Sequence, residues 1–299
     1  MLQYNKEGSA LMKQLSSYVK AFELYLHSLN KSPHTVKQYT IDAKQFAEIV
    51  QHEATIEEAL QLYTKRMKES YDSVSSINRK FASIRNFLQF LQLRGEVGLY
   101  HPNTLQPLAK NHQHIPLLKK SQAKKAMTFW QHQYEIAQTD EHQWLALRNA
   151  SIIFVIAELG IKPAELVKME WKHWDKDTNE LVILSTKKYR TLTISQKLSQ
   201  LLDRYKEETY QFLPNSEHAP YIWLGIGNKQ GEPITVKTIE RIFLTMSQKL
   251  HFKITATNLR YYVIQFKSQQ TDEMDELVEQ FGYARKGVLT ERQQRFKES

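Results

Sequence analysis

The sequence predicts a mainly α-helical protein with a small antiparallel β-sheet, divided into an N-terminal helical bundle and a larger C-terminal domain. Apolar residues recur every three or four positions through most of the first hundred residues, which is the period of an amphipathic helix. A short hairpin pattern appears in the second half. The length of 299 residues favours two domains, and a hydrophobic content of 41% is enough for packed cores.

The charge balance indicates a polyanionic partner. Lysine and arginine total 41 against 32 acidic residues, a net charge of +9. No apolar run of 18 residues and no signal-peptide pattern occurs, so we expect a cytoplasmic protein with no membrane partner. Such a basic protein most often binds nucleic acid, although a merely soluble basic protein is the alternative. The absence of cysteine excludes disulfides, thiolate metal sites and cysteine catalysis.

Four helices are predicted in the N-terminal part. The first covers residues 11–29, and Ser32-Pro33 opens the second, because serine can cap the free N–H groups and proline suits the first turn. The third covers residues 55–68 and begins with Thr-Ile-Glu-Glu, a cap followed by acids near the positive helix end. The fourth covers residues 75–95. Together they make one small bundle.

Three basic residues and an asparagine lie on the polar face of the fourth helix. Clustered arginine and lysine neutralise phosphates, so this face is a candidate for contact with DNA. A solvated surface without a partner is an equally good interpretation. The four residues are Asn78, Arg79, Lys80 and Arg85.

Residues 106–120 are predicted to link the two domains, which would cover residues 1–105 and 121–299. This segment contains prolines, lacks a clear periodicity and ends with Lys119-Lys120. It also contains His112 and His114. Because no further ligand cluster lies nearby, we predict neither a metal site nor a cofactor.

Helices dominate the C-terminal domain. Residues 144–159 are apolar throughout, which predicts a buried helix, and Gly160 after them is a typical C-cap. The tail over residues 287–299 carries apolar residues among charges and could pack on its own domain or on a neighbouring subunit. The other predicted elements are helices over 121–138, 198–212, 235–250 and around Arg260, a strand over 221–224, a turn over 225–233, and an acidic helix from Thr271.

A hairpin is predicted from residues 181–184 and 192–194. Its tip carries Lys187, Lys188 and Arg190, which suit contact with phosphates. An ordinary basic hairpin tip is the alternative interpretation.

Three stretches of the C-terminal half carry a resemblance to a known family. Thr255 to Tyr262 reads T-A-T-N-L-R-Y-Y, and Phe281-Gly282-Tyr283 follows with 22 residues from Arg260 to Gly282. Gly160 to Leu166 reads G-I-K-P-A-E-L. These stretches resemble the H-x-L-R-H, Leu-Gly-His and G-L-R-x-S-E-L boxes of the tyrosine recombinases, the phage integrase superfamily.

The N-terminal helices extend the resemblance to residues 11–292. Ser32, Thr35 and Tyr39, with N-R-K-x-x-S-I-R-N-F over 78–87, resemble the SAM-like core-binding domain of that family, whose two corresponding helices face DNA. The resemblance implies two domains that form a DNA clamp. The DNA contacts that it implies in the N-terminal domain are Thr35, Lys37, Asn78, Arg79, Lys80 and Arg85.

The resemblance also implies roles for C-terminal residues. In that family two arginines grip the scissile phosphate, and Lys162 and Arg260 stand at their positions. Thr257 stands where a histidine belongs, and Lys187 or Lys188 stands where a hairpin lysine is a general acid. Lysine offers a point charge in place of a planar fork, so Lys162 is a poor substitute for arginine in stabilising a transition state.

The family's nucleophilic tyrosine has no counterpart at the expected place. It should lie near Glu291 or Arg292, and no tyrosine follows Tyr283. Strand cleavage in the family is covalent catalysis by that tyrosine. The sequence therefore predicts that the chain is not an enzyme and has no catalytic residue. The DNA contacts predicted in the C-terminal domain are Lys162, Lys187, Lys188, Arg190, Thr257 and Arg260.

These observations predict a sequence-specific, double-stranded DNA-binding transcriptional regulator, most simply a phage or prophage repressor. Some integrase-like repressors of Bacillus prophages, of the SPbeta type, resemble this chain. A homo-oligomer on DNA and a regulatory protein or peptide are further candidate partners. One alternative is an active recombinase with an atypical nucleophile, Tyr261 or Tyr283, or with a tyrosine from another subunit. The other is an accessory subunit that docks on a recombinase through the tail.

Overall fold

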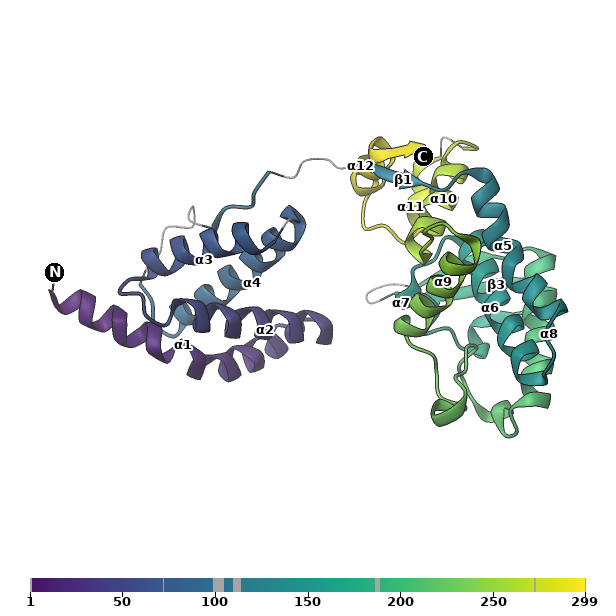
Figure 1. Ribbon diagram of the computed structural model, residues 1–299, viewed down its shortest axis with the longest axis horizontal. Coiled ribbons are helices and arrows are strands. Elements are labelled where there is room, and N and C mark those ends of the chain that lie inside the picture. Colours follow the sequence, from purple (N-terminus) through teal and green to yellow (C-terminus); the bar gives the residue numbers. More distant parts are fainter. Residues whose placement is uncertain are drawn as a thin grey trace. The chain divides into compact units, whose positions relative to one another are not determined.

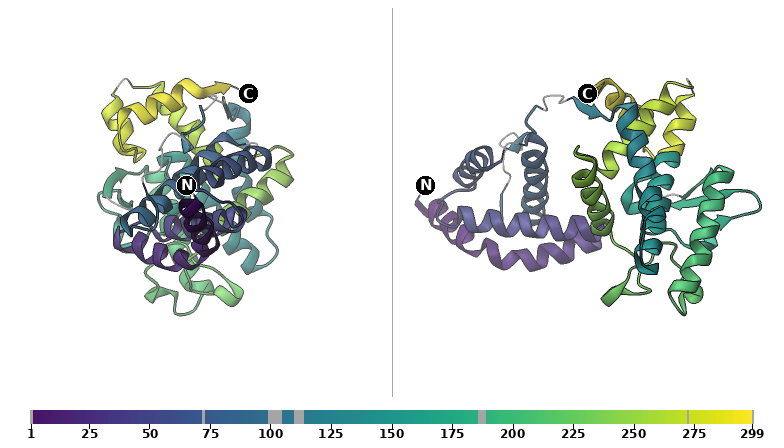
Figure 2. Two further views of the ribbon diagram at one scale, coloured as in Figure 1. Left: turned by 90° about the vertical axis from the view of Figure 1, so that its left-hand side faces the viewer. Right: turned by 45° about the vertical axis from the view of Figure 1, so that its right-hand side comes forward.

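The N-terminal unit is a bundle of helices whose starts follow from local capping. The computed structural model describes residues 2–71, 73–98, 105–109, 114–185, 189–271 and 273–298, and the chain divides into two units, 1–112 and 113–299. Helices α1 and α2 lie side by side as an antiparallel pair (Figures 1 and 2). The helices of this unit are α1 (Leu2–Ser28), α2 (Pro33–Val50), α3 (Ile56–Ser70) and α4 (Val74–Leu93).

Two of the predicted helix starts are confirmed by their caps. The Ser32 hydroxyl accepts a hydrogen bond from the Thr35 N–H, and Pro33 occupies the first turn of α2. The Thr55 hydroxyl accepts a hydrogen bond from the Glu58 N–H, and the Glu58 carboxylate accepts one from the Thr55 N–H, which completes a capping box at the start of α3.

Aromatic rings pack against one another in the core of the N-terminal unit. The rings of Phe22 and Phe87 lie 5.0 Å apart, and those of Phe46 and Tyr63 meet edge to face at 5.1 Å. Such pairs add about 0.5–1.5 kcal/mol each beyond the burial of their area. A charged residue, Asp42, is also fully buried between α2 and α4.

The C-terminal unit is built around α6 (Asp140–Leu159), which packs against α5 (Lys120–Glu135), α8 (Gln196–Phe212) and α10 (Ala256–Ser268). A three-stranded antiparallel sheet has the order β2-β3-β4, with Leu181 opposite Leu192. The mainly helical fold with this small sheet confirms the predicted fold class. The strands are β2 (Trp174–Asp175), β3 (Glu180–Leu184) and β4 (Tyr189–Thr193), and the other helices are α7 (Pro163–Leu166), α9 (Val236–Leu250), α11 (Met274–Gln280) and α12 (Lys286–Arg295).

Two predictions of local structure are wrong. Residues 221–224 form no strand of a sheet, because Tyr221 and Leu224 each make one isolated bridge, to Glu170 and Pro233. The predicted linker contains a strand, β1 (Ile115–Leu117), which pairs in parallel with the C-terminal β5 (Phe296–Glu298) (Figure 1).

The tail of the chain packs on its own unit. Leu289 of α12 is fully buried against Val263, Leu277 and Phe281. The tail was predicted to pack either on its own domain or on a neighbouring subunit, and in the structure it packs on its own domain. The pairing of β5 with β1 fixes the end of the tail as well.

Gly160 allows α6 to end against Phe281. Its backbone is left-handed, with φ of 61°, and a Cβ atom at this position would lie 2.6 Å from Phe281 Cε1. We expect Gly160→Ala to lower the free energy of unfolding of the C-terminal unit by about 2–4 kcal/mol, from left-handed strain plus overpacking. Urea unfolding followed by tryptophan fluorescence reports on this unit, because all 5 tryptophans follow residue 112.

Gly227→Ala is the matched control for Gly160→Ala. Gly227 has the same φ of 61°, but nothing lies within 4 Å of a Cβ atom built there. The control should therefore lose only the strain component, about 1 kcal/mol. Equal losses in the two variants would show that contact with Phe281 does not matter.

Candidate nucleic-acid interface

Among the described residues, four basic side chains converge on the turn of residues 280–283 that follows α11. Three of them donate to successive backbone carbonyls: Arg190 Nε to Gln280 at 2.9 Å, Arg260 Nη2 to Phe281 at 2.8 Å, and Lys162 Nζ to Gly282 at 2.8 Å. The fourth, the guanidinium of Arg292, lies 5.5 Å from the ring centre of Tyr283. We name Lys162, Arg190, Arg260 and Arg292 the basic cluster.

Helix geometry explains why cations gather here. The last carbonyls of a helix have no partner within it, and the helix dipole places partial negative charge at that end. Three members of the cluster satisfy the carbonyls at and just beyond this helix end, and the four members come from four different places in the chain. Lys162 precedes α7, and the three arginines come from β4, α10 and α12.

Gly282 gives Arg190 access to the turn. The Gly282 backbone is left-handed, with φ of 61°, and a Cβ atom there would lie 2.8 Å from Arg190 Nη1. A side chain at this position would displace the guanidinium. The Phe-Gly-Tyr motif therefore has a glycine where a side chain would keep Arg190 from packing against the turn.

Glu165 is the carboxylate that holds the cluster together. Its two oxygens accept hydrogen bonds from the two terminal nitrogens of Arg190, at 3.1 and 3.0 Å. One of them also accepts from the backbone N–H of Lys162, at 3.0 Å. Burial raises the pKa of Glu165, but the hydrogen bonds from Arg190 and Lys162 outweigh burial, so the pKa lies below its ordinary value of 4.5.

Arg260 is buried and fixed at both ends of its guanidinium. It donates to the carbonyl oxygens of Gly160 and Phe281, and its guanidinium lies 5.5 Å from the ring centre of Tyr283. Burial lowers the pKa of Arg260 and, first among several causes, that of Lys162. Both cations are therefore less stable in their charged form than they would be in water.

Arg292 extends the cluster through two tyrosines. It donates to the hydroxyl of Tyr261, and its guanidinium lies 5.3 and 5.5 Å from the ring centres of Tyr261 and Tyr283. From the sequence, Arg292 was notable only as the place of a missing tyrosine. The role of Glu165 was not predicted either, although Pro163 and a glutamate three residues after Lys162 are signals of a helix start that are visible in the sequence.

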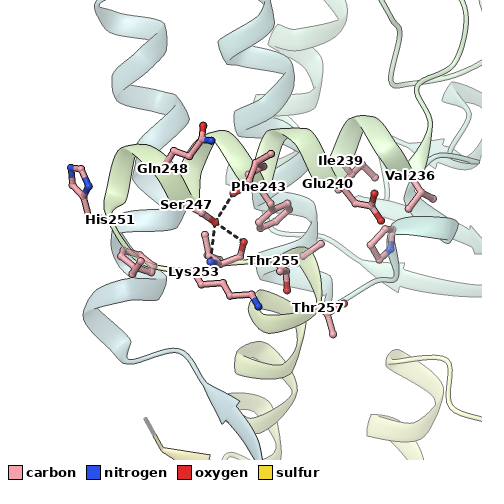
Figure 3. Close-up of a pocket in the computed structure, with 15 residues that line it drawn as sticks. Val236, Ile239, Glu240, Phe243, Ser247, Gln248, His251, Lys253, Thr255 and Thr257 are labelled. Atoms are coloured by element: carbon pink, nitrogen blue, oxygen red, sulfur yellow. Dashed lines mark hydrogen bonds between the residues drawn. The ribbon is translucent and has the colours of Figure 1, made fainter. Parts of the chain in front are cut away.

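The structure brings together three of the six contacts predicted in this unit, Lys162, Arg190 and Arg260. Lys187 and Lys188 lie outside the described residues. Thr257 is exposed on the first turn of α10 and lines a largely apolar groove of about 780 Å³ beside α9 (Figure 3). In that groove Ser247 joins the end of α9 to the backbone of Ile254.

Polar groups of α4 hold other parts of the N-terminal unit in place. The amide of Asn78 makes two hydrogen bonds with the backbone of Leu108, at 2.8 and 2.7 Å, and Arg85 donates to the carbonyl of Leu105. These contacts fix the segment of residues 105–109 against the helix.

The remaining predicted contacts of this unit differ in exposure. Arg79 and Lys80 both bind Asp42, and Lys80 is buried whereas Arg79 is partly exposed. On α2, the Thr35 hydroxyl bonds that of Ser32 at 2.8 Å, and Lys37 is exposed. Arg79 and Lys37 therefore remain accessible to a ligand.

Comparisons with known proteins bear out the resemblance at the level of the superfamily. Residues 19–95 match the family described as phage integrase, N-terminal SAM-like domain. The chain is 26% identical over 200 residues to a tyrosine recombinase XerD-like protein of Streptococcus mutans, covering 67% of this chain and 74% of the relative. It is 24% identical over 249 residues to tyrosine recombinase XerA of Pyrococcus furiosus, covering 82% and 78%.

Solved structures agree in fold. The XerH site-specific recombinase bound to palindromic difH substrate has a TM-score of 0.69 at 14% identity, covering 95% of this chain and 81% of that one. The chain therefore shares the fold of this recombinase. Together, the N-terminal match and the curated relatives support the tyrosine recombinase, or phage integrase, superfamily for this chain.

The prediction that the chain is not an enzyme is contradicted by these comparisons. The relatives that it matches are named tyrosine recombinases, which are enzymes. The prediction depended on the lack of a tyrosine near Arg292, yet Tyr261 and Tyr283 both lie beside Arg292 in the structure. A missing residue at one position was too narrow a basis for that conclusion.

Membrane-spanning helices and metal-binding groups are both absent from the described residues. In that part of the chain, no helix is long and apolar enough to cross a membrane. The same residues contain no group of three histidine, cysteine, aspartate or glutamate side chains placed to hold a metal ion.

Proposed function

We propose that this protein binds double-stranded DNA sequence-specifically and regulates transcription, as the repressor of a phage or prophage. The observation that carries the proposal is the basic cluster on the 280–283 turn. It gathers four cationic side chains, and among the described residues one carboxylate, Glu165, contacts them. A phosphate of the DNA backbone would supply the missing negative charge.

The members of the basic cluster differ in how much of their surface is exposed. The Lys162 side chain keeps 41% of its surface exposed, whereas Arg190 and Arg260 are 6% and 4% exposed. Lys162 is therefore better able than Arg190 or Arg260 to reach a phosphate. The two buried arginines hold the turn and the Lys162 backbone in position.

Phosphate contacts position a protein on DNA, and contacts to base edges supply specificity. A chain with two units can contact more of a site than one unit alone. Relatives of this fold have been solved on DNA, among them XerH bound to difH and a lambda integrase dimer bound to a core site. These complexes support double-stranded DNA as the ligand class of this chain.

Lys162→Ala should weaken DNA binding. It should also reduce the magnitude of the negative slope of log affinity against log salt by about 0.9, the value for one phosphate contact. The measurement is fluorescence anisotropy on one duplex at several salt concentrations. Lys197→Ala, an exposed lysine of the same unit on α8, is the control and should leave the slope unchanged. An unchanged slope in Lys162→Ala would remove Lys162 from the interface.

Capture of genomic DNA fragments on the purified protein tests the proposal as a whole. Discrete fragments that release on denaturation support sequence-specific binding. Each fragment would then be placed before a reporter gene, where expression should fall when the protein is present. Random fragments, or a reporter that does not respond, would overturn the proposed regulator.

A site-specific recombinase is the second candidate function, and the names of the relatives favour it. Tyr261 and Tyr283 are the tyrosines that contact the basic cluster. Recombination would leave a fraction of the captured DNA covalently attached after denaturation. Loss of that fraction in Tyr261→Phe or Tyr283→Phe would identify the nucleophile.

A further inference from the structure

The largely apolar groove beside α9 is a preformed hollow of the C-terminal unit. Its volume is about 780 Å³, and it lies between α9 and the segment of residues 251–257 (Figure 3). The Ser247 hydroxyl joins these two walls, because it accepts a hydrogen bond from the Ile254 N–H at 3.0 Å and lies 2.9 Å from the Ile254 carbonyl oxygen. A groove that is fixed in this way needs little rearrangement when another molecule covers it.

Apolar side chains of this groove are exposed to water. Leu244 on α9 is 58% exposed, whereas Phe243 beside it is 2% exposed. Val236 and Phe252, which also line the groove, are half-buried. Covering such a surface with apolar side chains of another molecule removes it from water and is therefore favourable.

Two charged residues of the lining lie at different places along the groove. Glu240 lies one turn before Leu244 on α9, whereas Lys253 lies beyond the C-terminal end of that helix (Figure 3). Both side chains are exposed, and among the described residues neither forms an ion pair. Each is therefore available to a charge of opposite sign on another molecule.

The tail of the same chain is not the molecule that covers the groove. Leu289 of the tail is fully buried in its own unit, and the ring of Phe296 lies 5.6 Å from that of Tyr261. The two largest apolar side chains of the described tail are therefore already packed. The apolar groups that cover the groove have to come from another chain.

We propose that the groove is the interface of a dimer, in which a second copy of this chain covers it. In a dimer with a two-fold axis near Leu244, the two α9 helices run antiparallel, and each contact occurs twice. Glu240 of each copy then faces Lys253 of the other, and Leu244 of each copy enters the apolar groove of the other. The arrangement accounts for an exposed leucine that lies between Glu240 and Lys253.

The dimer competes with the DNA binding proposed above, and this part of the inference rests on that proposed function. Pro163, which follows the phosphate contact Lys162, lines the groove, as does Thr257. A second copy over the groove therefore limits access to Lys162. Because DNA and the second copy exclude each other, DNA should dissociate the dimer.

Sedimentation of the full chain from nanomolar to submillimolar concentration tests the dimer. The unmodified protein should change from monomer to dimer. Leu244→Asp should weaken the dimer by about a hundred-fold, because each dimer loses two buried leucines. Leu93→Asp on α4, which changes a leucine that is 69% exposed, is the control and should leave the dimer unchanged. A protein that stays monomeric, or a dimer that Leu244→Asp leaves unaltered, would overturn the proposal.

Exchange of the two charges tests how the copies are paired. Glu240→Lys and Lys253→Glu should each weaken the dimer by about ten-fold, because like charges then face each other twice. A mixture of these two variants should form a heterodimer, since one copy presents two lysines and the other two glutamates. Circular dichroism checks that each variant is folded. A mixture that associates no better than either variant alone would refute the pairing of Glu240 with Lys253.

Addition of a captured DNA duplex separates this inference from the proposed function. The duplex should convert the dimer to DNA-bound monomers, and Leu244→Asp should bind the duplex more tightly than the unmodified protein does. A dimer that persists on the duplex would refute the competition. Failure to bind any duplex would overturn the proposed function, while the sedimentation of Leu244→Asp still decides whether the groove is the dimer interface.

Discussion

Replacing Arg260 with alanine is expected to lower the free energy of unfolding of the C-terminal unit by about 3 kcal/mol. The change leaves the carbonyls of Gly160 and Phe281 without their charged donor at a buried site. It also removes a guanidinium from the face of the Tyr283 ring. Urea unfolding followed by tryptophan fluorescence measures the loss, and DNA binding should weaken under conditions where the variant is still folded.

Two further variants are compared with Arg260→Ala. Arg260→Lys keeps the charge but cannot reach two carbonyls as a fork does, so it should lose about half as much stability. Arg241→Ala removes an exposed arginine on α9 and should change stability by less than about 0.5 kcal/mol. Arg260→Ala with the stability of Arg241→Ala would show that the two hydrogen bonds contribute nothing.

The starts of α2 and α3 were predictable because their causes are local, whereas α1 begins at Leu2, before the predicted residue 11, without such a cap among the described residues. The capping groups of α2 and α3 lie within three residues of the N–H groups that they satisfy. Gly160 ends α6 for a local reason too, since a left-handed residue favours glycine. These features depend on neighbours in the sequence and not on the rest of the fold.

The pairing of β1 with β5 was not predictable in this way. Its partners lie at opposite ends of the C-terminal unit, and three residues in each strand give no alternating pattern to detect. The strand predicted over 221–224 failed for the related reason that an apolar run of four residues fits a buried loop equally well. In both cases tertiary contacts decided the outcome.

The motifs located the basic cluster but not the direction of its side chains. Arg190 was predicted to contact phosphate from the hairpin tip. On β4, however, Arg190 and Leu192 are the buried residues of an alternating strand, so the Arg190 side chain points inward to Glu165. Lys80 was also predicted to contact DNA, but its side chain is buried and donates to Asp42. This contact was not predictable because Asp42 lies on a different helix. A charge count from sequence cannot separate such paired cations from free ones.

Replacing Glu165 with alanine is expected to have the largest effect on stability, a loss of about 3–5 kcal/mol from the C-terminal unit. The Arg190 guanidinium would be left buried without its carboxylate, and the Lys162 N–H without its acceptor. Glu165→Gln keeps the shape and one acceptor, so it should lose less. A loss below about 1 kcal/mol in Glu165→Ala would mean that water replaces the carboxylate without cost.

The pH dependence of the same pair gives an independent check. Because the pKa of Glu165 is lower in the folded chain than its ordinary value of 4.5, ionised Glu165 stabilises the fold fully above that value. This contribution is lost as the pH falls through the lower, folded pKa. The difference in unfolding free energy between the unmodified protein and Glu165→Gln should therefore be constant at neutral pH and shrink in acid. Urea midpoints over a pH series measure it, and a difference that grows on acidification would contradict the ion pair with Arg190.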